Sequence, residues 1–345
     1  MTDTLRVARA ALAEEARRPV SGADFAEHVM TAVRRAVPFD GYCLLGLDPC
    51  SGMRSFLFSR NGLDGMAERL AHNETVELDV HRYSDLARAA VPVGVLSAGT
   101  SAGAASPRMN EILRPAGFSS ELRLALASQG RLWGALVMFR CDRRTPFTDE
   151  EAARALALTD PLRAVVRRYP VRSTTGASDP LPPGVVLLDS NNSIVSMTLE
   201  ARAWLDDVRA GGQDEIDAAD VLRVVYDVAL ATQAATAESA SPVCRVRTTS
   251  GRWLLVHGSR VDGSPADVAV VLQQAAVRQV LPAASAWFGL TQREGEILQL
   301  VALGLQAKHM GRQLQLSVLT VNDHLGAIYR KAGVSGREQL LARLG

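Results

Sequence analysis

The last sixty residues of the chain repeat a helical spacing of apolar residues three times, and this constrains the fold more than any other feature. Residues on the buried face of a helix recur three or four positions apart; here they are Leu290, Ile297, Leu298, Val301, Met310, Leu314, Val321, Leu325 and Ile328. Short turns at Gly304-Leu305 and Gln315-Leu316-Ser317 interrupt the spacing. The hydroxyl of Ser317 is placed to accept a hydrogen bond from a free amide of the helix that follows. The pattern predicts an all-helical module over 290–345 with a helix-turn-helix layout, whose second helix, 318–332, would lie in the major groove of DNA.

This segment resembles the helix-turn-helix domains of the LuxR/NarL family. The residues that carry the resemblance follow one another in the family's order: Leu290-Thr291, Arg293-Glu294, Glu296-Ile297-Leu298, Gly304-Leu305, Lys308, Ser317, Thr320-Val321, His324-Leu325, Ile328-Tyr329-Arg330-Lys331 and Gly333-Val334. The resemblance implies that double-stranded DNA is a partner, that the chain forms a homodimer, and that RNA polymerase is a further partner.

On this resemblance a set of side chains is expected to contact DNA: Lys308, Arg312, Ser317, Leu319, Thr320, Asn322, Asp323, His324, Arg330 and Lys331. The basic members of the set would meet phosphates. Leu319, Asn322 and Asp323 would face base edges instead.

The sequence also departs from the family's pattern. After Lys308 it continues with His309-Met310-Gly311, where the family has an acidic residue, isoleucine and alanine. Asn322 and Gly326 stand where the family has basic residues, and Asp323 adds a negative charge that phosphates repel. Two interpretations stay open. In the first, Gly326 allows a close approach to DNA. In the second, the domain binds DNA weakly or only as a dimer.

The charge distribution supports DNA binding modestly. Residues 286–345 contain seven Lys and Arg against four Asp and Glu, an excess of three positive charges, while the whole chain has a net charge of +1. Positive charge therefore concentrates where phosphates would be met, but strong non-specific binding is not expected. Lys308 and Lys331 are the only lysines. Since a phosphate-binding P-loop needs a lysine, an ATPase upstream is excluded, and a phospho-acceptor receiver domain is not expected either.

Length and composition are those of a multidomain globular protein. A chain of 345 residues has room for two or three domains, and 47% hydrophobic with 22% charged residues is typical of a soluble protein. No apolar stretch reaches the eighteen residues of a membrane span, and no signal peptide is recognisable at the N-terminus. Four cysteines without a CxxC pair indicate free thiols in a reducing cytoplasm, so we expect a cytoplasmic protein with no membrane partner.

Residues 1–170 alternate helical and strand patterns. FDGYCLLGLDP, RSFLFSR, ELRLALAS and RLWGALVMFR are strand-like, and 128–131 (Ser-Gln-Gly-Arg) predicts a hairpin turn between the last two. Thr148 and Glu151 predict a capping box at the start of a later helix. The pieces FDGYCLLGLDP, RPAGFSSELRLAL and GRLWGALVMFR resemble the GAF-type sensor halves of actinobacterial LuxR regulators, which implies a GAF-like α/β sensor domain.

Residues 180–275 follow a linker at 173–183 and read as strand, turn, strand, helix and returning strands, with turns at Ser250-Gly251 and Asp262-Gly263. This order resembles a PAS domain. The expected fold class is therefore α+β, with a GAF-like domain at 1–170, a PAS-like α+β domain at 180–275 and the all-α module at 286–345. Pro282 and the alanines around it predict a short adjustable hinge before the module.

In a GAF-like fold a ligand pocket lies between the sheet and the long segment that covers it, here residues 81–118. The small residues at 97–106 predict a flexible lid. Five side chains are expected to add polar or aromatic contacts to an apolar cavity: Tyr42, His81, Tyr83, Arg123 and Trp133. Each of them taken alone is also compatible with an ordinary place in the core or at its rim.

Catalysis is not expected, because a nucleophilic enzyme needs a nucleophile with a base and an orienting group. Cys43 lies in an apolar strand where thiols are usually inert, whereas Cys50 lies in a turn. No second histidine stands at ligand spacing from His81, since His72 is nine residues away, so no metal is expected. No cofactor signature is recognisable.

Two functions stay open. The first is a one-component transcription regulator that senses a small-molecule effector through the GAF-like domain and binds DNA through the helix-turn-helix. The alternative is a non-enzymatic interaction protein with a degenerate helix-turn-helix that binds DNA weakly or not at all. The missing basic residues at Asn322 and Gly326 favour this alternative.

Overall fold

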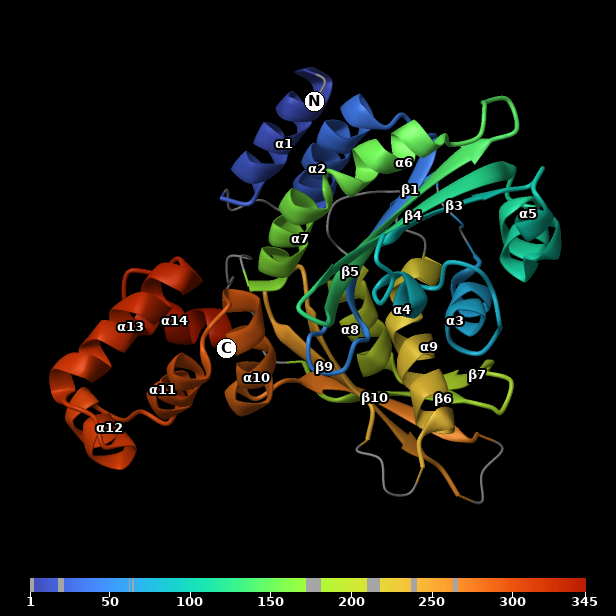
Figure 1. Cartoon of the computed structure of the whole chain (residues 1–345). Coiled ribbons are helices and arrows are strands. Elements are labelled where there is room, and N and C mark those ends of the chain that lie inside the picture. The colour runs from blue at the N-terminus through green and yellow to red at the C-terminus, as the bar shows by residue number, and fades with distance from the viewer. Residues whose placement is uncertain are drawn as a thin grey trace.

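The structure of the chain is a computed structural model. The residues that it describes are 3–17, 22–61, 63, 65–171, 181–209, 218–236, 241–262 and 266–345. Within these residues the strands form two antiparallel sheets of five strands each, and an all-helical segment follows them (Figure 1). The predicted α+β class is confirmed. Most of the expected linker at 173–183 lies outside the described residues, as does Gly263 of the expected turn at Asp262-Gly263.

The first sheet has the strand order β2-β1-β5-β4-β3. Its strands are β1 (Gly41–Leu47), β2 (Arg54–Arg60), β3 (Val93–Ser97), β4 (Phe118–Ser128) and β5 (Arg131–Cys141). The predicted hairpin turn joins β4 to β5. Gln129 and Gly130 both have positive φ there, 51° and 73°. Such turns match the twist of the two strands that they connect.

Helices cover both faces of the first sheet. One face carries α1 (Asp3–Glu15), α2 (Gly22–Ala36), α6 (Asp149–Leu156) and α7 (Thr159–Arg168), followed by the 3-10 turn η2 (Tyr169–Val171). The other face carries α3 (Ala67–Thr75), α4 (Tyr83–Leu86) and the π-helical turn η1 (Arg108–Leu113). Because side chains alternate along a strand, Leu44 packs into the first of these layers and Cys43 into the second.

Two local predictions for this domain have different outcomes. The capping box is confirmed, since Thr148 and Glu151 exchange the expected hydrogen bonds at the start of α6. The flexible lid at 97–106 is wrong, because α5 (Ser101–Ala105) forms there and the Thr100 side chain accepts from the Gly103 amide. A Cβ at Gly103 would lie 2.0 Å from the Ser97 carbonyl oxygen. The small residues thus allow close packing rather than movement.

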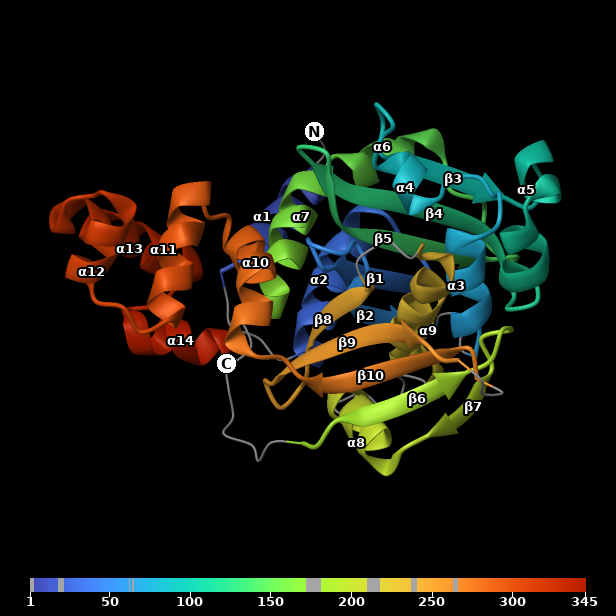
Figure 2. The ribbon, with the colours of Figure 1, turned by 90° about the horizontal axis from the view of Figure 1, so that it is seen from below.

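The second sheet repeats the order of the first, as β7-β6-β10-β9-β8. Its strands are β6 (Gly184–Leu188), β7 (Ile194–Met197), β8 (Val243–Arg247), β9 (Trp253–Arg260) and β10 (Val268–Gln274). α8 (Leu199–Arg209) and α9 (Ala218–Ala234) cover one face. α9 lies between the two domains, because it packs on β9 and β10 from one side and on α3 and β2 from the other (Figure 2).

Two ion pairs with little solvent exposure join the first domain to the second. Arg54 of β2 donates through Nε to Asp227 Oδ2 of α9 at 2.6 Å, and through Nη2 to Oδ1. Arg245 of β8 donates through Nη1 to Asp48 Oδ2 at 2.8 Å. Neither pair involves residues that are near one another in the sequence, so both depend on the docking of the two domains.

The C-terminal segment is all-helical, as predicted, with α10 (Val277–Phe288), α11 (Gln292–Ala302), α12 (Ala307–Leu314), α13 (Val318–Ala332) and α14 (Arg337–Leu344). The expected hinge around Pro282 is wrong. α10 forms there, and it buries Val280, Leu281 and Trp287. The chain turns at Gly289 instead, where a φ of 68° ends α10. No described helix is long and apolar enough to cross a membrane.

Candidate functional site

The helix-turn-helix is held by hydrogen bonds at each of its turns. Thr291 caps α11 by accepting from the Glu294 amide, and the Glu294 carboxylate accepts from the Thr291 amide at 2.7 Å. Arg293 Nη2 donates to the Leu314 carbonyl at 2.6 Å, which fixes the end of α12. Ser317 caps α13 by accepting from the Thr320 amide at 3.0 Å, as predicted.

Arg337 and Lys331, both partly exposed, also hold this framework together. Arg337 donates to the Leu305 and Val301 carbonyls at 2.6 and 2.8 Å, which closes the turn between α11 and α12. Lys331 Nζ lies 2.6 Å from Glu294 Oε2 and ties the end of α13 to the start of α11. Burial acts to raise the pKa of Glu294, but the hydrogen bond and charge of Lys331, together with the hydrogen bonds from Thr291, outweigh it and the pKa is lowered.

α13 presents one face to solvent and one to the core. Val321, Ile328 and Ala332 are buried against the other helices. The opposite face is exposed and contains Val318, Leu319, Asn322, Asp323, Gly326 and Arg330. The predicted recognition helix at 318–332 therefore forms with an accessible face, although the segment as a whole is docked on the two sheet domains.

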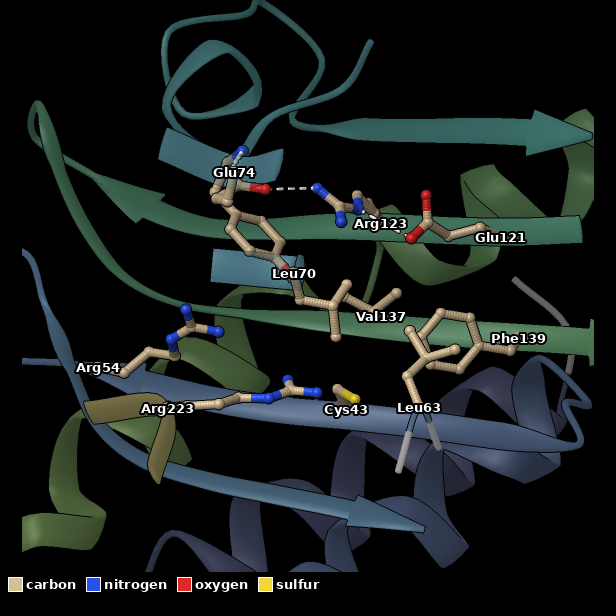
Figure 3. A pocket seen from close by; sticks show the side chains of 11 residues that line it. Cys43, Arg54, Leu63, Leu70, Glu74, Glu121, Arg123, Val137, Phe139 and Arg223 are labelled. Carbon is tan, nitrogen blue, oxygen red and sulfur yellow. Dashed lines mark hydrogen bonds and ion pairs between the residues drawn. The ribbon is translucent and has the colours of Figure 1, made fainter. Parts of the chain in front are cut away.

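The described residues also enclose a cavity against the second layer of the first sheet. The space free inside it is about 20 Å³, enough for about one water molecule, and it opens to the surface. The lining residues come from both sheet domains: Cys43, Arg54, Leu63, Leu70, Glu74, Tyr83, Glu121, Arg123, Val137, Phe139 and Arg223. In Figure 3 the row Glu74, Arg123 and Glu121 lies on one side, and Arg54 and Arg223 lie on the other.

A network of ion pairs forms the first of these sides. Arg123 donates through Nη1 to Glu74 at 2.8 Å and through Nε to Glu121 at 3.0 Å. Arg108, whose side chain is fully buried, donates through Nε to the other Glu121 oxygen at 3.0 Å. Burial acts to raise the pKa of Glu121, but the two guanidinium groups outweigh it and the pKa is lowered. Burial raises the pKa of Tyr83, which lies under Arg123, to about 12.

Comparison with known families decides what the helical segment is. Residues 289–344 match the family model described as "Bacterial regulatory proteins, luxR family". This segment is a LuxR-family domain. No curated protein matches the sequence of the chain.

Solved structures resemble the chain only distantly. SdiA of Escherichia coli is 14% identical, with 99% of this chain and 96% of that chain covered and a TM-score of 0.36. The GAF domain of the cyanobacteriochrome TePixJ is 13% identical, with 45% of this chain and 93% of that chain covered and a TM-score of 0.27. The assignment of the LuxR-family domain therefore rests on the family model.

The residues expected to contact DNA fall into three groups in the LuxR-family domain. Those on its exposed surface are Lys308, Arg312, Ser317, Leu319, Asn322, Asp323 and Arg330. Thr320 and His324 are partly buried beside them. Lys331 is partly exposed, and its ammonium group pairs with Glu294. Among the basic members, Lys308, Arg312 and Arg330 are thus left on the surface of this fully described domain.

Two of the five residues expected to line the cavity do so, namely Tyr83 and Arg123. Tyr42 does not, because it lies one position from Cys43 in β1 and so faces the opposite layer, where it is buried against Phe39. Trp133 does not either, since it packs in the core that joins the sheets to the LuxR-family domain.

His81 lies at the edge of the cavity rather than in its lining. Its carbonyl accepts from Arg123 Nη1 at 3.3 Å, while its ring packs over Gly94 of β3, where a Cβ would approach within 2.5 Å. Burial, with a smaller effect of Arg108, lowers the pKa of the His81 imidazole. A lowered pKa favours the neutral form of the His81 ring at pH 7.

The sequence gives no sign of the residues that the second domain supplies. Arg223 comes from α9 and lines the cavity together with Arg54, while Asp227, one helical turn further along α9, pairs with Arg54. Their helical spacing is visible in the sequence, but nothing local indicates that this helix meets the first sheet. In the described residues no group of three or more His, Cys, Asp or Glu could hold a metal ion.

Proposed function

We propose that the chain is a one-component transcription regulator. In this proposal the LuxR-family domain binds double-stranded DNA through α13. A small-molecule effector binds in the cavity of the first, GAF-like domain by displacing side chains of its lining, because the free volume of about 20 Å³ holds only about one water molecule. One observation carries the proposal. The segment that matches the luxR family model keeps its recognition helix capped at Ser317 and exposed along one face. The domain boundaries expected from the sequence, 1–170, 180–275 and 286–345, belong to the same proposal.

The position of α9 supports an effector cavity coupled to the rest of the chain. α9 contributes Arg223 to the lining and Asp227 to the ion pair with Arg54, while its other side packs on β9. β9 in turn carries Trp253, whose ring stacks on Trp287 of α10 at 5.2 Å. A ligand in the cavity would therefore contact α9, and the second sheet connects α9 to the DNA-binding segment.

DNA would be bound by a homodimer, because two half-sites about one helical turn apart require two recognition helices. Lys308, Arg312 and Arg330 are the exposed bases of each LuxR-family domain, which predicts about three phosphate contacts per protomer. For a dimer, log K would then fall with log salt with a slope of about −5. RNA polymerase is a further proposed partner, and no catalytic role is proposed.

DNA binding is tested by fluorescence anisotropy of the full chain with its own upstream DNA over a range of salt concentrations. Lys308→Ala should weaken binding to all sequences alike and make the salt slope shallower by about one unit per protomer, because one phosphate contact is lost. Arg278→Ala is the matched control, since Arg278 is an exposed arginine on α10 outside the matched segment. An unchanged slope for Lys308→Ala would remove Lys308 from the phosphate contacts.

The small number of exposed bases also favours the second candidate, an interaction protein with a degenerate helix-turn-helix. Asp323 lies on the same face of α13 and opposes phosphate approach. Absence of any DNA complex at both low and moderate salt would favour this candidate over the regulator.

A further inference from the structure

The exposed face of α13 has a composition that limits which base pairs it can read. Val318 is 46% exposed and Leu319 is 72% exposed, so two large apolar side chains face solvent at the start of the helix. Asn322 and Asp323 follow one turn later. A Cβ at Gly326 would meet nothing within 4 Å, so the middle of this face is open.

Guanine is the base that this face is least able to read. Its major-groove edge presents two acceptors, O6 and N7, which arginine or lysine contacts with two donors. From residue 317 to residue 329 the sequence contains neither arginine nor lysine. Arg330 is the first, and it lies about 18 Å along the helix axis from Val318. Since base edges are met mainly by the N-terminal residues of a recognition helix, Arg330 is placed for the phosphate backbone.

A·T pairs offer what the exposed side chains can contact. An asparagine amide can donate to N7 of adenine and accept from its N6 amino group, and apolar side chains can contact the C5 methyl group of thymine. Asn322 and the pair Val318 and Leu319 supply these two kinds of contact. The open surface at Gly326 allows the helix backbone to approach the bases closely. Asp323, at the flank, can accept from the N4 amino group of cytosine.

We propose that α13 reads a half-site centred on A·T pairs, with Asn322 recognising adenine and Val318 and Leu319 recognising thymine methyl groups. At most one G·C pair would be read, through Asp323. This inference rests on the proposed DNA binding and states its specificity. The exposed leucine and valine are then part of the DNA-reading surface, and their burial in the major groove compensates for the small number of phosphate contacts.

The experiment is selection of bound duplexes from a random library by the full chain at low salt, followed by affinity measurement on the enriched site. The enriched half-site should be rich in A·T pairs. Asn322→Ala should reduce the preference for adenine at one position by about 5- to 150-fold, the range of a bidentate base contact. Asn322→Arg should change that preference from adenine to guanine.

Thymine recognition has its own test, because deoxyuridine lacks only the C5 methyl group. Replacing the thymines of the enriched site by deoxyuridine should weaken binding of the original chain several-fold. The same replacement should have little effect on Leu319→Ala. Arg278→Ala, outside the reading face, should behave like the original chain.

The outcomes separate this inference from the proposed function. Tight binding to a G·C-rich site, or binding without sequence preference, would overturn the inference and leave DNA binding intact. Equal sensitivity of Leu319→Ala and the original chain to deoxyuridine would overturn the role of Leu319. Absence of any complex with the library would overturn the proposed function itself.

Discussion

The arginines of this chain differ in whether a carboxylate lies beside the guanidinium group. Arg108 and Arg123 share Glu121, whose side chain is 1% exposed. Arg247 of β8, by contrast, leaves Nε and Nη2 buried without an acceptor in the part of the chain that the structure describes. Burial, together with repulsion from Arg343, lowers the pKa of Arg247 to about 10. The ion pairs of Arg108 and Arg123 stabilise the cavity wall. Arg247 combines two buried donors that lack acceptors among the described residues with a hydrogen bond from Nη1 to the Arg343 carbonyl at 3.2 Å and a contact of its guanidinium group with the Trp253 ring.

The network around Glu121 leads to a prediction about acid stability. Glu121→Gln should lower the free energy of unfolding by up to about 3 kcal/mol at pH 7, because two buried guanidinium groups lose their shared carboxylate while each keeps a second one, Asp79 for Arg108 and Glu74 for Arg123. The pKa of Glu121 is lowered below its usual 4.5 in the folded chain, so its contribution is present at neutral pH and is lost as the pH falls through that lowered value. Urea unfolding of both chains from pH 7 to pH 3 measures this.

The variant should therefore show a weaker dependence of stability on pH than the original chain. Glu150→Gln is the matched control, since Glu150 pairs with Arg154 at the surface and is 78% exposed. A surface pair of this kind contributes little to stability. If Glu121→Gln were as stable as Glu150→Gln, the network would not hold the cavity wall.

At the scale of elements, the helices and turns whose ends are marked by a capping or turn residue are predictable from the sequence. α13 is expected at 318–332 and forms at Val318–Ala332 because Ser317 caps it and Gly333, with a φ of 66°, ends it. The turn between β4 and β5 follows from Gln129-Gly130 in the same way. These signals act within a few residues, so no knowledge of the remaining chain is needed.

Elements that meet only in the folded chain are not predictable in this way. Arg54 and Asp227 are 173 positions apart, and nothing in either segment indicates the other. The sequence therefore misses α9 as a wall of the cavity. The misplacement of Tyr42 has a different cause, since an error of one residue in the pleat moves a side chain to the opposite face of the sheet. α10 is missed as a packed helix because Pro282 is a helix-breaking signal that the tertiary contacts override.

The cavity between α3, α9 and the first sheet gives the prediction at this scale. Leu70 of α3 lines it, so Leu70→Phe should fill part of the space. Native mass spectrometry of the full chain, exposed to a metabolite extract of its host, should detect a bound small molecule that the variant no longer retains. DNA affinity without the extract should be unchanged, because the cavity is remote from α13.

Leu199→Phe serves as the control for this experiment, since Leu199 lies on α8 and is 80% exposed. It should retain the bound molecule. Equal retention by Leu70→Phe and Leu199→Phe would place the effector elsewhere, and no bound molecule in any of the three chains would contradict effector sensing by this cavity.

At the scale of the whole molecule, the LuxR-family domain is docked through a core that all three parts of the chain share. Trp253 of β9 stacks on Trp287 of α10, and its Nε1 donates to the Arg343 carbonyl of α14 at 3.1 Å. Arg343 Nη1 also donates to the Val171 carbonyl of the first domain at 3.3 Å. The exposed face of α13 is not covered by this docking. In the proposed regulator, control of DNA binding would therefore act on the relative positions of the two LuxR-family domains of the proposed dimer, and not on access to α13.

One substitution should shift the equilibrium between the docked and the released LuxR-family domain. Stacking of Trp253 favours the docked arrangement, whereas the two donors of Arg247 without acceptors oppose it, at a cost of about 1–3 kcal/mol each. Arg247→Met keeps an unbranched chain against the Trp253 ring and removes these two donors. It also removes the hydrogen bond from Arg247 Nη1 to the Arg343 carbonyl at 3.2 Å, but that carbonyl still accepts from Trp253 Nε1, and one net hydrogen bond contributes less than two buried donors without acceptors cost. The variant should have a higher free energy of unfolding and remain docked more firmly.

If the regulator must release its LuxR-family domains to place them on two half-sites, firmer docking reduces DNA affinity. A joint more stable by about 1.4 kcal/mol should weaken binding by up to about tenfold, because only the released population binds. Trp253→Phe, which reduces the stacked area on Trp287, should have the opposite effect on both quantities. Small-angle scattering measures the release as an increase in the radius of gyration, and anisotropy measures the affinity. Should Arg247→Met stabilise the chain yet leave both the radius of gyration and the DNA affinity as they were, the joint would be structural only, and an effector in the cavity would have to act on DNA binding by another route.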